Sequence, residues 1–364
     1  MGQSDYKIYS STSDAWKGMY DALLGAQKSI CWEVYTFVDD SVGNLFFDLL
    51  KRKAREGVDV KIIVDYWGSF WLSGKKIEDL KKNGIDIRLF SDKKLRSLLW
   101  WGVLTFRTHK KILVIDEQIG FVGGVNVHKS MENWLDIHLR VEGKIVRSLL
   151  RLFARSYITC GGDKFKVRHY LVWKQRVRQN EMDLVYDRPT FKKFHVKKKY
   201  TEALMKARER VILFSPYYFP DKEFLLALWS ARKRGVKIDL LIPFRTDLRL
   251  ATYAAYFWFS VMHRYGVSVH IMKRMMHGKG VVVDDDWAMI GSSNIDLPSF
   301  YYSHEANVQF NDKKMVGSLK EIMENWIKNS EKLDILKWRR RGFWRKFKEW
   351  ASVKIYQFWL GTKK

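Results

Sequence analysis

The residues with the clearest chemical potential occur in two copies. One stretch, 109–126, reads HKKILVIDEQIGFVGGVN, and a second, 277–294, reads HGKGVVVDDDWAMIGSSN. Both follow one template: His, any residue, Lys, four residues, Asp, six residues, Gly-Gly or Gly-Ser, one residue and Asn. The equivalent polar positions are His109 and His277, Lys111 and Lys279, Asp116 and Asp284, and Asn126 and Asn294.

A duplicated histidine suits a reaction in which the two copies have opposite tasks. One histidine can act as a nucleophile while the other protonates the leaving group. Two lysines and two asparagines would surround them with a cation-rich set of hydrogen-bond donors, which suits the negative oxygens of a phosphoryl group. No Gly-x-Ser-x-Gly elbow is present, which argues against a Ser/His/Asp hydrolase. A metal site is disfavoured because the lysines would repel a cation, so we expect neither metal nor cofactor.

The carboxylates near the motifs fall into two groups. Asp116 and Asp284 lie five residues beyond the lysines, a spacing that puts them on the opposite face of a strand, and we interpret them as structural residues of a turn. Asp136 and Glu305 follow the asparagines by about ten residues. They are the candidates to orient the histidines, because a carboxylate on the far ring nitrogen fixes the tautomer and stabilises the imidazolium.

The duplication extends beyond the motifs. Each half runs from an apolar strand with aromatics and an acidic turn, through a helix closed by Gly, to a second apolar strand. The paired ranges are 29–40 and 210–221, 44–57 and 223–235, and 58–65 and 236–243. Alternating strands and helices predict an α/β sandwich with a mixed, mostly parallel sheet in each half. The halves would face each other so that both motifs meet in one cleft. We expect boundaries at 1–163, 164–330 and 331–364, the last a basic, aromatic, amphipathic segment.

The charge points to a polyanionic partner. The chain of 364 residues has 66 Lys and Arg against 40 Asp and Glu, a formal net charge of +26. Such an excess attracts nucleic acid or an anionic membrane, whereas solubility needs only a few net charges. No apolar run reaches the roughly 18 residues that span a bilayer, and the N-terminus resembles no signal peptide. The two cysteines form no zinc or disulfide pattern.

Three segments could contact a membrane surface, because they combine cations with large apolar side chains. They are 93–111, 252–266 and 338–364. In the first, the apolar residues between basic flanks are Leu98, Leu99, Trp100, Trp101 and Leu104. The alternative for each segment is a helix that packs within the protein.

The motifs resemble those of the phospholipase D superfamily, which carries two HKD motifs, and most closely those of bacterial cardiolipin synthases. The resemblance covers about residues 7–327 and includes EVYTFVDD, FVGGVNV, SPYYFPD, HGKGVVVDDDWAMIGSSNID and HEANV. It implies a duplicated phospholipase D-type α-β-α sandwich and a phosphohistidine intermediate formed without metal. The N-terminal transmembrane hairpin of some cardiolipin synthases is absent here, so we expect membrane contact to come from elsewhere.

The resemblance also implies roles. His109 would be the nucleophile and His277 the general acid and later base. The phosphodiester would be held by Lys111, Lys279, Asn126 and Asn294. The expected reaction joins two phosphatidylglycerol molecules into cardiolipin and glycerol. The expected partner is an anionic membrane of phosphatidylglycerol and cardiolipin, with no nucleic acid, at the cytoplasmic face of the bacterial inner membrane. Hydrolysis to phosphatidic acid and a nucleic-acid phosphodiesterase are the alternatives; oligomeric state stays open.

Overall fold

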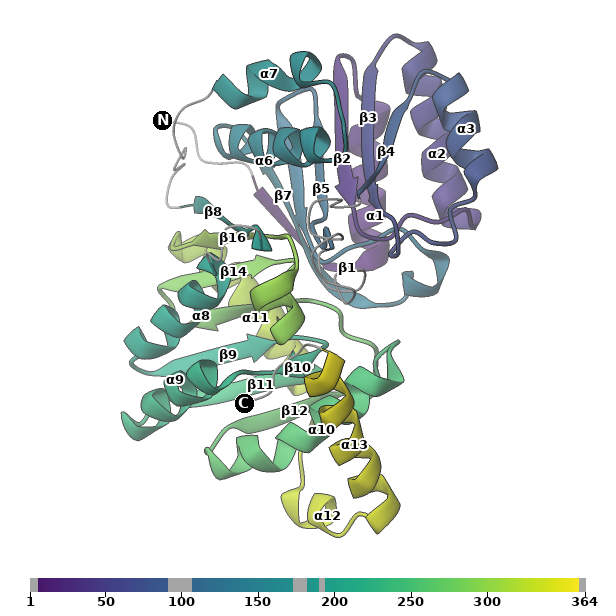
Figure 1. Ribbon diagram of the computed structural model, residues 1–364. Coiled ribbons are helices and arrows are strands. Elements are labelled where there is room, and N and C mark those ends of the chain that lie inside the picture. The colour runs from purple at the N-terminus through teal and green to yellow at the C-terminus, as the bar shows by residue number, and fades with distance from the viewer. Residues whose placement is uncertain (1–5, 91–106, 173–181, 190–193, 360–364) are drawn as a thin grey trace.

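Two mixed β-sheets organise the molecule. The structure is a computed structural model that describes residues 6–90, 107–172, 182–189 and 194–359 (Figure 1). The first sheet has the strand order β1 (Tyr6–Ser11), β7 (Leu135–Glu142), β6 (Ile119–Gly123), β5 (Ile112–Ile115), β2 (Ser29–Val34), β3 (Asp59–Asp65) and β4 (Asp86–Phe90).

The second sheet repeats this plan with one strand added at the edge. Its order is β17 (Glu331–Lys332), β12 (Ser268–Met272), β11 (Lys237–Pro243), β9 (Arg210–Phe214), β13 (Gly280–Val283), β14 (Trp287–Gly291), β16 (Glu305–Phe310) and β8 (Met182–Asp187). Two short strands, β10 (Tyr218–Phe219) and β15 (Ile295–Asp296), pair in parallel apart from it.

The two similar α/β halves with mixed sheets confirm the prediction, but the expected predominance of parallel strands is wrong. In each sheet of the described chain only two pairings are parallel, β2–β3 and β3–β4 in the first, β9–β11 and β11–β12 in the second. The others are antiparallel. The reason is local: each motif folds as a hairpin with a three-residue turn, and so short a connection forces antiparallel pairing.

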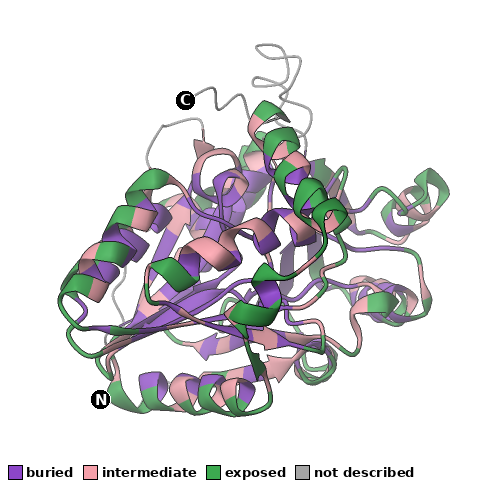
Figure 2. Cartoon of the chain, turned by 90° about the horizontal axis from the view of Figure 1, so that it is seen from below, coloured by how far each residue is buried: buried purple, intermediate pink, exposed green. Residues whose placement is uncertain are grey.

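Helices cover both sheets in layers (Figures 1 and 2). The outer face of the first sheet packs against α1 (Thr12–Leu24), α2 (Ser41–Arg55) and α3 (Gly74–Lys82). The outer face of the second packs against α8 (His195–Lys206), α9 (Lys222–Lys233) and α10 (Arg249–Arg264). The core that the two sheets share also contains side chains of α6 (Ile145–Thr159), α7 (Lys164–Val172) and α11 (Lys313–Lys328). Figure 2 shows strands that are largely buried beneath helices with one exposed face.

The predicted acidic turns are helix N-caps. Asp40 accepts from the backbone N–H groups of Val42 and Gly43 at the start of α2, and Asp221 accepts from Phe224 N at the start of α9. Carboxylates are favoured there because they satisfy otherwise unpaired N–H groups. After α2, Gly57 has a φ of 91°, a conformation that ends a helix and favours glycine.

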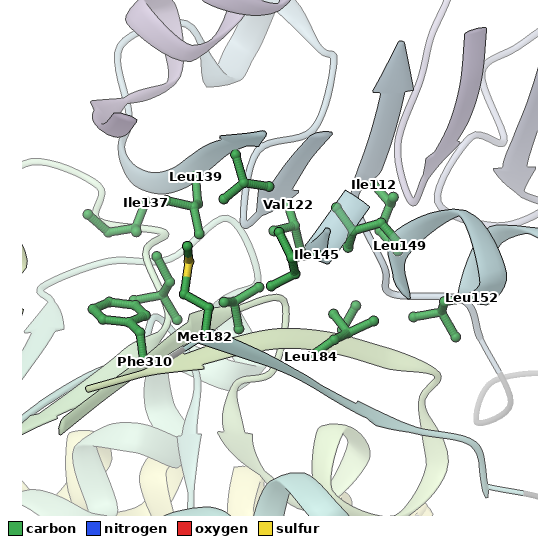
Figure 3. Packing of buried hydrophobic residues seen from close by; sticks show 14 of the residues in the cluster. Ile112, Val122, Ile137, Leu139, Ile145, Leu149, Leu152, Met182, Leu184 and Phe310 are labelled. Carbon is green, nitrogen blue, oxygen red and sulfur yellow. The ribbon is translucent and has the colours of Figure 1, made fainter. Parts of the chain in front are cut away.

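One hydrophobic core joins the halves. Ile137, Leu139 and Val122 of the first sheet approach Met182 and Phe310 of the second (Figure 3). Helix α7 packs on α6, and β8 pairs with β16. The predicted boundary at residue 163 lies just before α7, and it stays a prediction.

The predicted membrane segments have different outcomes. Residues 93–106, which include Leu98, Leu99, Trp100, Trp101 and Leu104, lie outside the described residues. Segment 252–266 falls largely within α10, which buries Ala254, Phe259 and Met262, so the alternative of a packed helix holds there. Segment 338–364 contributes to α12 (Ile335–Arg339) and forms α13 (Phe343–Trp359). Among the described residues, no helix combines the length and the apolar character needed to cross a membrane.

Candidate active site

The two histidines lie where the halves meet. His109 precedes β5, and its backbone N–H donates to the carbonyl of His304 at 2.9 Å. His277 precedes β13, and its N–H donates to the carbonyl of Leu135 at 2.6 Å. His304 and Leu135 stand immediately before Glu305 and Asp136. Each histidine is therefore fixed to the start of a carboxylate-bearing strand of the opposite half.

This arrangement pairs each histidine with the other half's carboxylate. His109 Nδ1 lies 3.1 and 3.2 Å from the two carboxylate oxygens of Glu305. His277 Nδ1 lies 2.8 Å from Asp136 Oδ2. A carboxylate at Nδ1 places the proton on that nitrogen and leaves the Nε2 lone pair for chemistry. In both histidines the carboxylate thus engages Nδ1 and leaves Nε2 available for chemistry.

The Gly-Gly and Gly-Ser variants of the motif make the two pairs unequal. A Cβ at Gly124 would lie 2.1 Å from Asp136 Oδ1, so this carboxylate fits only because residue 124 has no side chain. At the equivalent position, the Ser292 hydroxyl donates a hydrogen bond to Glu305 Oε2. Glu305 thus contacts a histidine and a serine hydroxyl, whereas Asp136 faces His277 through Oδ2 and accepts from the backbone N–H of Ile137 through Oδ1.

The lysines bring two buried positive charges to the same place. Lys111 Nζ donates to the His109 carbonyl at 2.7 Å, and Lys279 Nζ donates to the His277 carbonyl at 2.5 Å. Burial lowers the pKa of Lys279 to about 8, against the opposing carboxylates. Burial and the charge of Lys279 hold the pKa of Lys111 well below its ordinary value. Such a pocket favours an anion that compensates both charges.

Burial also decides the protonation of the histidines. It lowers the pKa of His109 to about 4, and the charge of Lys111 adds to the effect while Glu305 opposes it. Burial and Lys279 lower the pKa of His277, against Asp136. Burial would raise the pKa of Glu305, but His109 and Lys111 outweigh it and lower that pKa. Burial thus favours neutral imidazoles, which lie beside ionised carboxylates, and a neutral imidazole can attack an electron-poor phosphorus.

The asparagines of the motif are held differently. Asn126 Oδ1 accepts from Thr36 N at 3.1 Å, and its backbone carbonyl accepts from Trp16 Nε1 at 2.7 Å. The carboxamide nitrogen of Asn126 remains a donor. Asn294 is buried, and its Oδ1 has no hydrogen-bond partner among the described residues.

The two aspartates of the motif lie at the hairpin turns, beyond the strands that the histidines precede. The carboxylate of Asp116 accepts from the N–H groups of Gln27, Lys28 and Ser29. Asp284 accepts from residues 208–210 in the same way. These contacts tie the motif hairpin to the neighbouring strand, which is a structural task.

Sequence reasoning assigned no role to several neighbours of the histidines. The ring of Tyr35 lies 5.1 Å from that of His109, and Lys111 Nζ lies 5.1 Å from the Tyr35 ring. The Trp134 ring lies 5.4 Å from that of His277. Asp65 accepts from Thr108 N at 3.1 Å, one residue before His109. For Tyr35, the one indication in the sequence was the group of aromatic residues that follows the first strand of each half.

Comparison with known proteins identifies the family of this chain. The family described as "Cardiolipin synthase, PLD-like domain" matches residues 19–156 and 200–327. Probable cardiolipin synthase YwiE of Bacillus subtilis (strain 168) is 29% identical over 360 residues, covering 93% of this chain and 69% of the relative. A cardiolipin synthase of Listeria innocua serovar 6a is 30% identical over 348 residues, covering 92% and 72%.

A solved structure supports the fold. Phosphatidylserine synthase of Haemophilus influenzae Rd KW20 superposes with a TM-score of 0.73 at 11% identity, covering 97% of this chain and 92% of that one. The family match spans most of the chain and contains both histidine motifs. The chain therefore belongs to the cardiolipin synthase family with phospholipase D-like domains.

Proposed function

We propose that this protein transfers a phosphatidyl group between two phosphatidylglycerol molecules and releases glycerol, which yields cardiolipin. The observation that carries the proposal is the cross-paired site, in which two Nε2 atoms and two lysines share one buried place. The names of the relatives support this substrate class.

The first step forms a phosphohistidine. His109 Nε2 attacks the phosphorus of the donor lipid, a P–N bond forms, and the P–O bond to the glycerol headgroup breaks. The leaving oxygen takes a proton from His277 Nε2, whose positive charge Asp136 stabilises. Substrate binding favours the protonated form of His277, because the phosphodiester anion offsets the lysine charges that lower the pKa of this residue.

The second step reverses the roles. His277, now neutral, removes the proton from a primary hydroxyl of the acceptor lipid. The hydroxyl oxygen attacks phosphorus, the P–N bond breaks, and cardiolipin leaves with His109 regenerated. In both steps the lysines and Asn126 would hold the negative oxygens as charge builds on them.

The assignment of the nucleophile rests on the unequal carboxylates. A nucleophilic histidine must be neutral at the start, and the pKa of about 4 suits His109. A general acid must carry its proton, and the shorter contact of Asp136 Oδ2 with His277 Nδ1, 2.8 Å against 3.1 Å between Glu305 Oε1 and His109 Nδ1, favours the imidazolium of His277. This division of tasks remains part of the proposal.

We further propose that the protein works as a peripheral enzyme on anionic lipid at the cytoplasmic face of a bacterial inner membrane. The net charge of +26 supports this, because each Lys or Arg near an anionic surface contributes about 1 kcal/mol. Protease protection in inverted and right-side-out vesicles tests the side: cleavage only in inverted vesicles is expected.

The reaction is tested with purified protein, phosphatidylglycerol vesicles and mass spectrometry of the lipids, beside His109→Ala and His277→Ala. Cardiolipin and free glycerol, absent with both variants, are expected. A donor with a nitrophenol leaving group, which needs no general acid, should load phosphohistidine onto His277→Ala but not onto His109→Ala. Phosphatidic acid without cardiolipin would make the protein a hydrolase. Cleavage of oligonucleotides with no lipid turnover would overturn the lipid assignment.

A further inference from the structure

A basic cavity lies beside α13, outside the paired-histidine site. Its volume is about 760 Å³, and it is enclosed by the loop after β11, the start of α10 and α13. Its lining includes aromatic and cationic side chains, among them Arg245, Arg249, Tyr253, Trp344, Arg345 and Lys348. We call this space the basic cavity.

The cations of the basic cavity lack matching anions. No described residue places a carboxylate oxygen within 4.0 Å of the charged groups of Arg245, Arg249 or Lys348. Arg345 lies 3.9 Å from Glu349, which is already held by Arg341 at 2.7 Å. The lining contains one carboxylate, Asp247. Four like charges around one cavity repel each other, and an anionic ligand would relieve that repulsion.

Helix α13 has a packed face and an exposed face, and the exposed face is aromatic. Glu349, Ser352 and Val353 are buried toward the protein, where α13 contacts α10 (Figure 1). Phe343 and Trp344 are each 72% exposed, and they continue along the helix into Phe347 and Trp350, which are also exposed. Neighbouring rings of this row are 5.8 to 6.5 Å apart.

The basic cavity adjoins the histidine site. Asp247 in its wall accepts a hydrogen bond from the Tyr217 hydroxyl at 2.5 Å. The Tyr217 carbonyl accepts from Ser215 Oγ, which in turn accepts from Ile295 N, the residue after Asn294. A short chain of contacts thus connects the cavity to the second motif.

We propose that the basic cavity binds the phosphate headgroup of an anionic phospholipid in a bilayer, while the aromatic row of α13 enters the membrane interface. A continuous row of aromatics beside clustered cations is the composition of an interfacial helix. A nucleic-acid surface would instead offer separated rings on which bases stack, and these rings pack on one another. This second lipid site goes beyond the proposed reaction, and α13 lies outside the residues matched by the family.

Binding to vesicles tests the site without turnover. The background is His109→Ala/His277→Ala, so that no lipid is consumed. Arg249→Ala/Lys348→Ala removes two cavity cations. Lys313→Ala/Lys314→Ala is the matched control, because it removes two exposed cations from the first turn of α11. Co-sedimentation with phosphatidylglycerol and phosphatidylcholine vesicles gives the affinities, and circular dichroism checks folding. Should the cavity variant unfold, Arg245→Gln on the loop makes the same test.

The expected result is a loss of about fivefold per cavity cation, hence roughly 25-fold for the cavity variant, with a smaller loss for the control. Trp344→Ser should weaken binding to phosphatidylglycerol vesicles further. If the cavity and control variants lost equal affinity for the vesicles, the effect would come from the net charge of the protein and not from the cavity. That result would overturn the proposal. Binding of inorganic phosphate that depends on Arg249 and Lys348, without any vesicle preference, would also overturn the lipid source. So would a loss of single-stranded oligonucleotide binding that exceeds the loss of vesicle binding.

The reaction and the second site can fail separately. Vesicle binding that depends on the cavity in a protein without cardiolipin synthesis would keep this inference and remove the proposed function. If the wild-type protein makes cardiolipin while the cavity variants bind vesicles normally, the proposed function stands and the second lipid site is overturned.

Discussion

At the scale of single residues, two chemically identical histidines receive different surroundings. The difference comes from one position, where Gly124 leaves room for Asp136 and Ser292 donates to Glu305. Each carboxylate accepts a second hydrogen bond, which comes from the Ser292 hydroxyl for Glu305 and from the backbone N–H of Ile137 for Asp136. We propose that this difference contributes to the separation of nucleophile from acid, together with the shorter contact of Asp136 with His277.

Removing either carboxylate's charge should impair catalysis without unfolding the protein. Glu305→Gln and Asp136→Asn keep the side-chain shapes, but an amide no longer fixes the Nδ1–H tautomer. We expect kcat to fall by about 10²- to 10⁴-fold, the range of comparable tautomer losses. Steady-state cardiolipin synthesis measures this. Ser292→Ala serves as a control and should lose less than tenfold; a larger loss would place Ser292 in the catalytic machinery.

The pH dependence of kcat/KM should reflect the titration of the Lys279 ammonium group. Its pKa is lowered to about 8, so the ammonium is present below pH 8 and is lost as the pH rises through that value. The free enzyme then loses a charge that binds the phosphodiester, and kcat/KM should fall above about pH 8. Lys279→Arg keeps its charge throughout, so its profile should stay flat in this limb even if its activity is lower. An unchanged alkaline limb in this variant would assign the titration to another group.

At the scale of elements, the motif is a hairpin whose turn is stabilised separately from its chemistry. Asp116 has a φ of 53° and Asp284 a φ of 49°, values that Asn and Asp tolerate better than most residues. Their carboxylates accept the backbone N–H groups of the adjoining strand. The aspartate of each motif thus holds the hairpin to its neighbouring strand, while the histidine and lysine lie at the proposed active site.

Substitution of the turn aspartate should affect stability and not turnover. Asp116→Ala removes the acceptor of three N–H groups and leaves a left-handed backbone without a suitable residue. We expect the free energy of unfolding to fall by about 1–3 kcal/mol, measured by urea denaturation, with kcat unchanged at 25 °C. Asp116→Asn keeps Oδ1 and the backbone preference and should lose less. A large fall in kcat for a folded Asp116→Asn would contradict the structural role.

At the scale of the whole molecule, the halves share one core and one site. Side chains from β5, β6 and β7 pack with those of β8, β14 and β16 and with α6 and α11 (Figure 3). Neither sheet could bury its inner face alone. The relative position of the halves, and with it the pairing of the histidines, depends on this common core.

A core substitution in either half should therefore destabilise both. Leu139 and Phe310 are buried in the shared core, and Leu139→Ala or Phe310→Ala should cost about 2–5 kcal/mol. Unfolding should remain a single transition when followed by tryptophan fluorescence and by far-ultraviolet circular dichroism. Two separated transitions would show that the halves fold independently.

The secondary structure and the pair of histidines could be predicted from the amino-acid sequence, because the patterns that indicate them are local. Strand and helix periodicity, N-cap aspartates such as Asp40, and the closing Gly57 act over a few residues, and the repeated motif identifies His109 and His277 as a pair. The family resemblance adds the duplicated fold.

Other features depend on contacts between distant parts of the chain. Glu305 is 196 positions from His109, and Asp136 is 141 positions from His277; no local pattern tells whether a carboxylate serves its own half or the other. The same dependence on distant contacts holds for three further features. These are the antiparallel majority in the sheets, the place of Tyr35 beside His109 and the packed face of α13. They follow from how two sheets bury their inner faces against each other, and that packing exists only in the folded molecule.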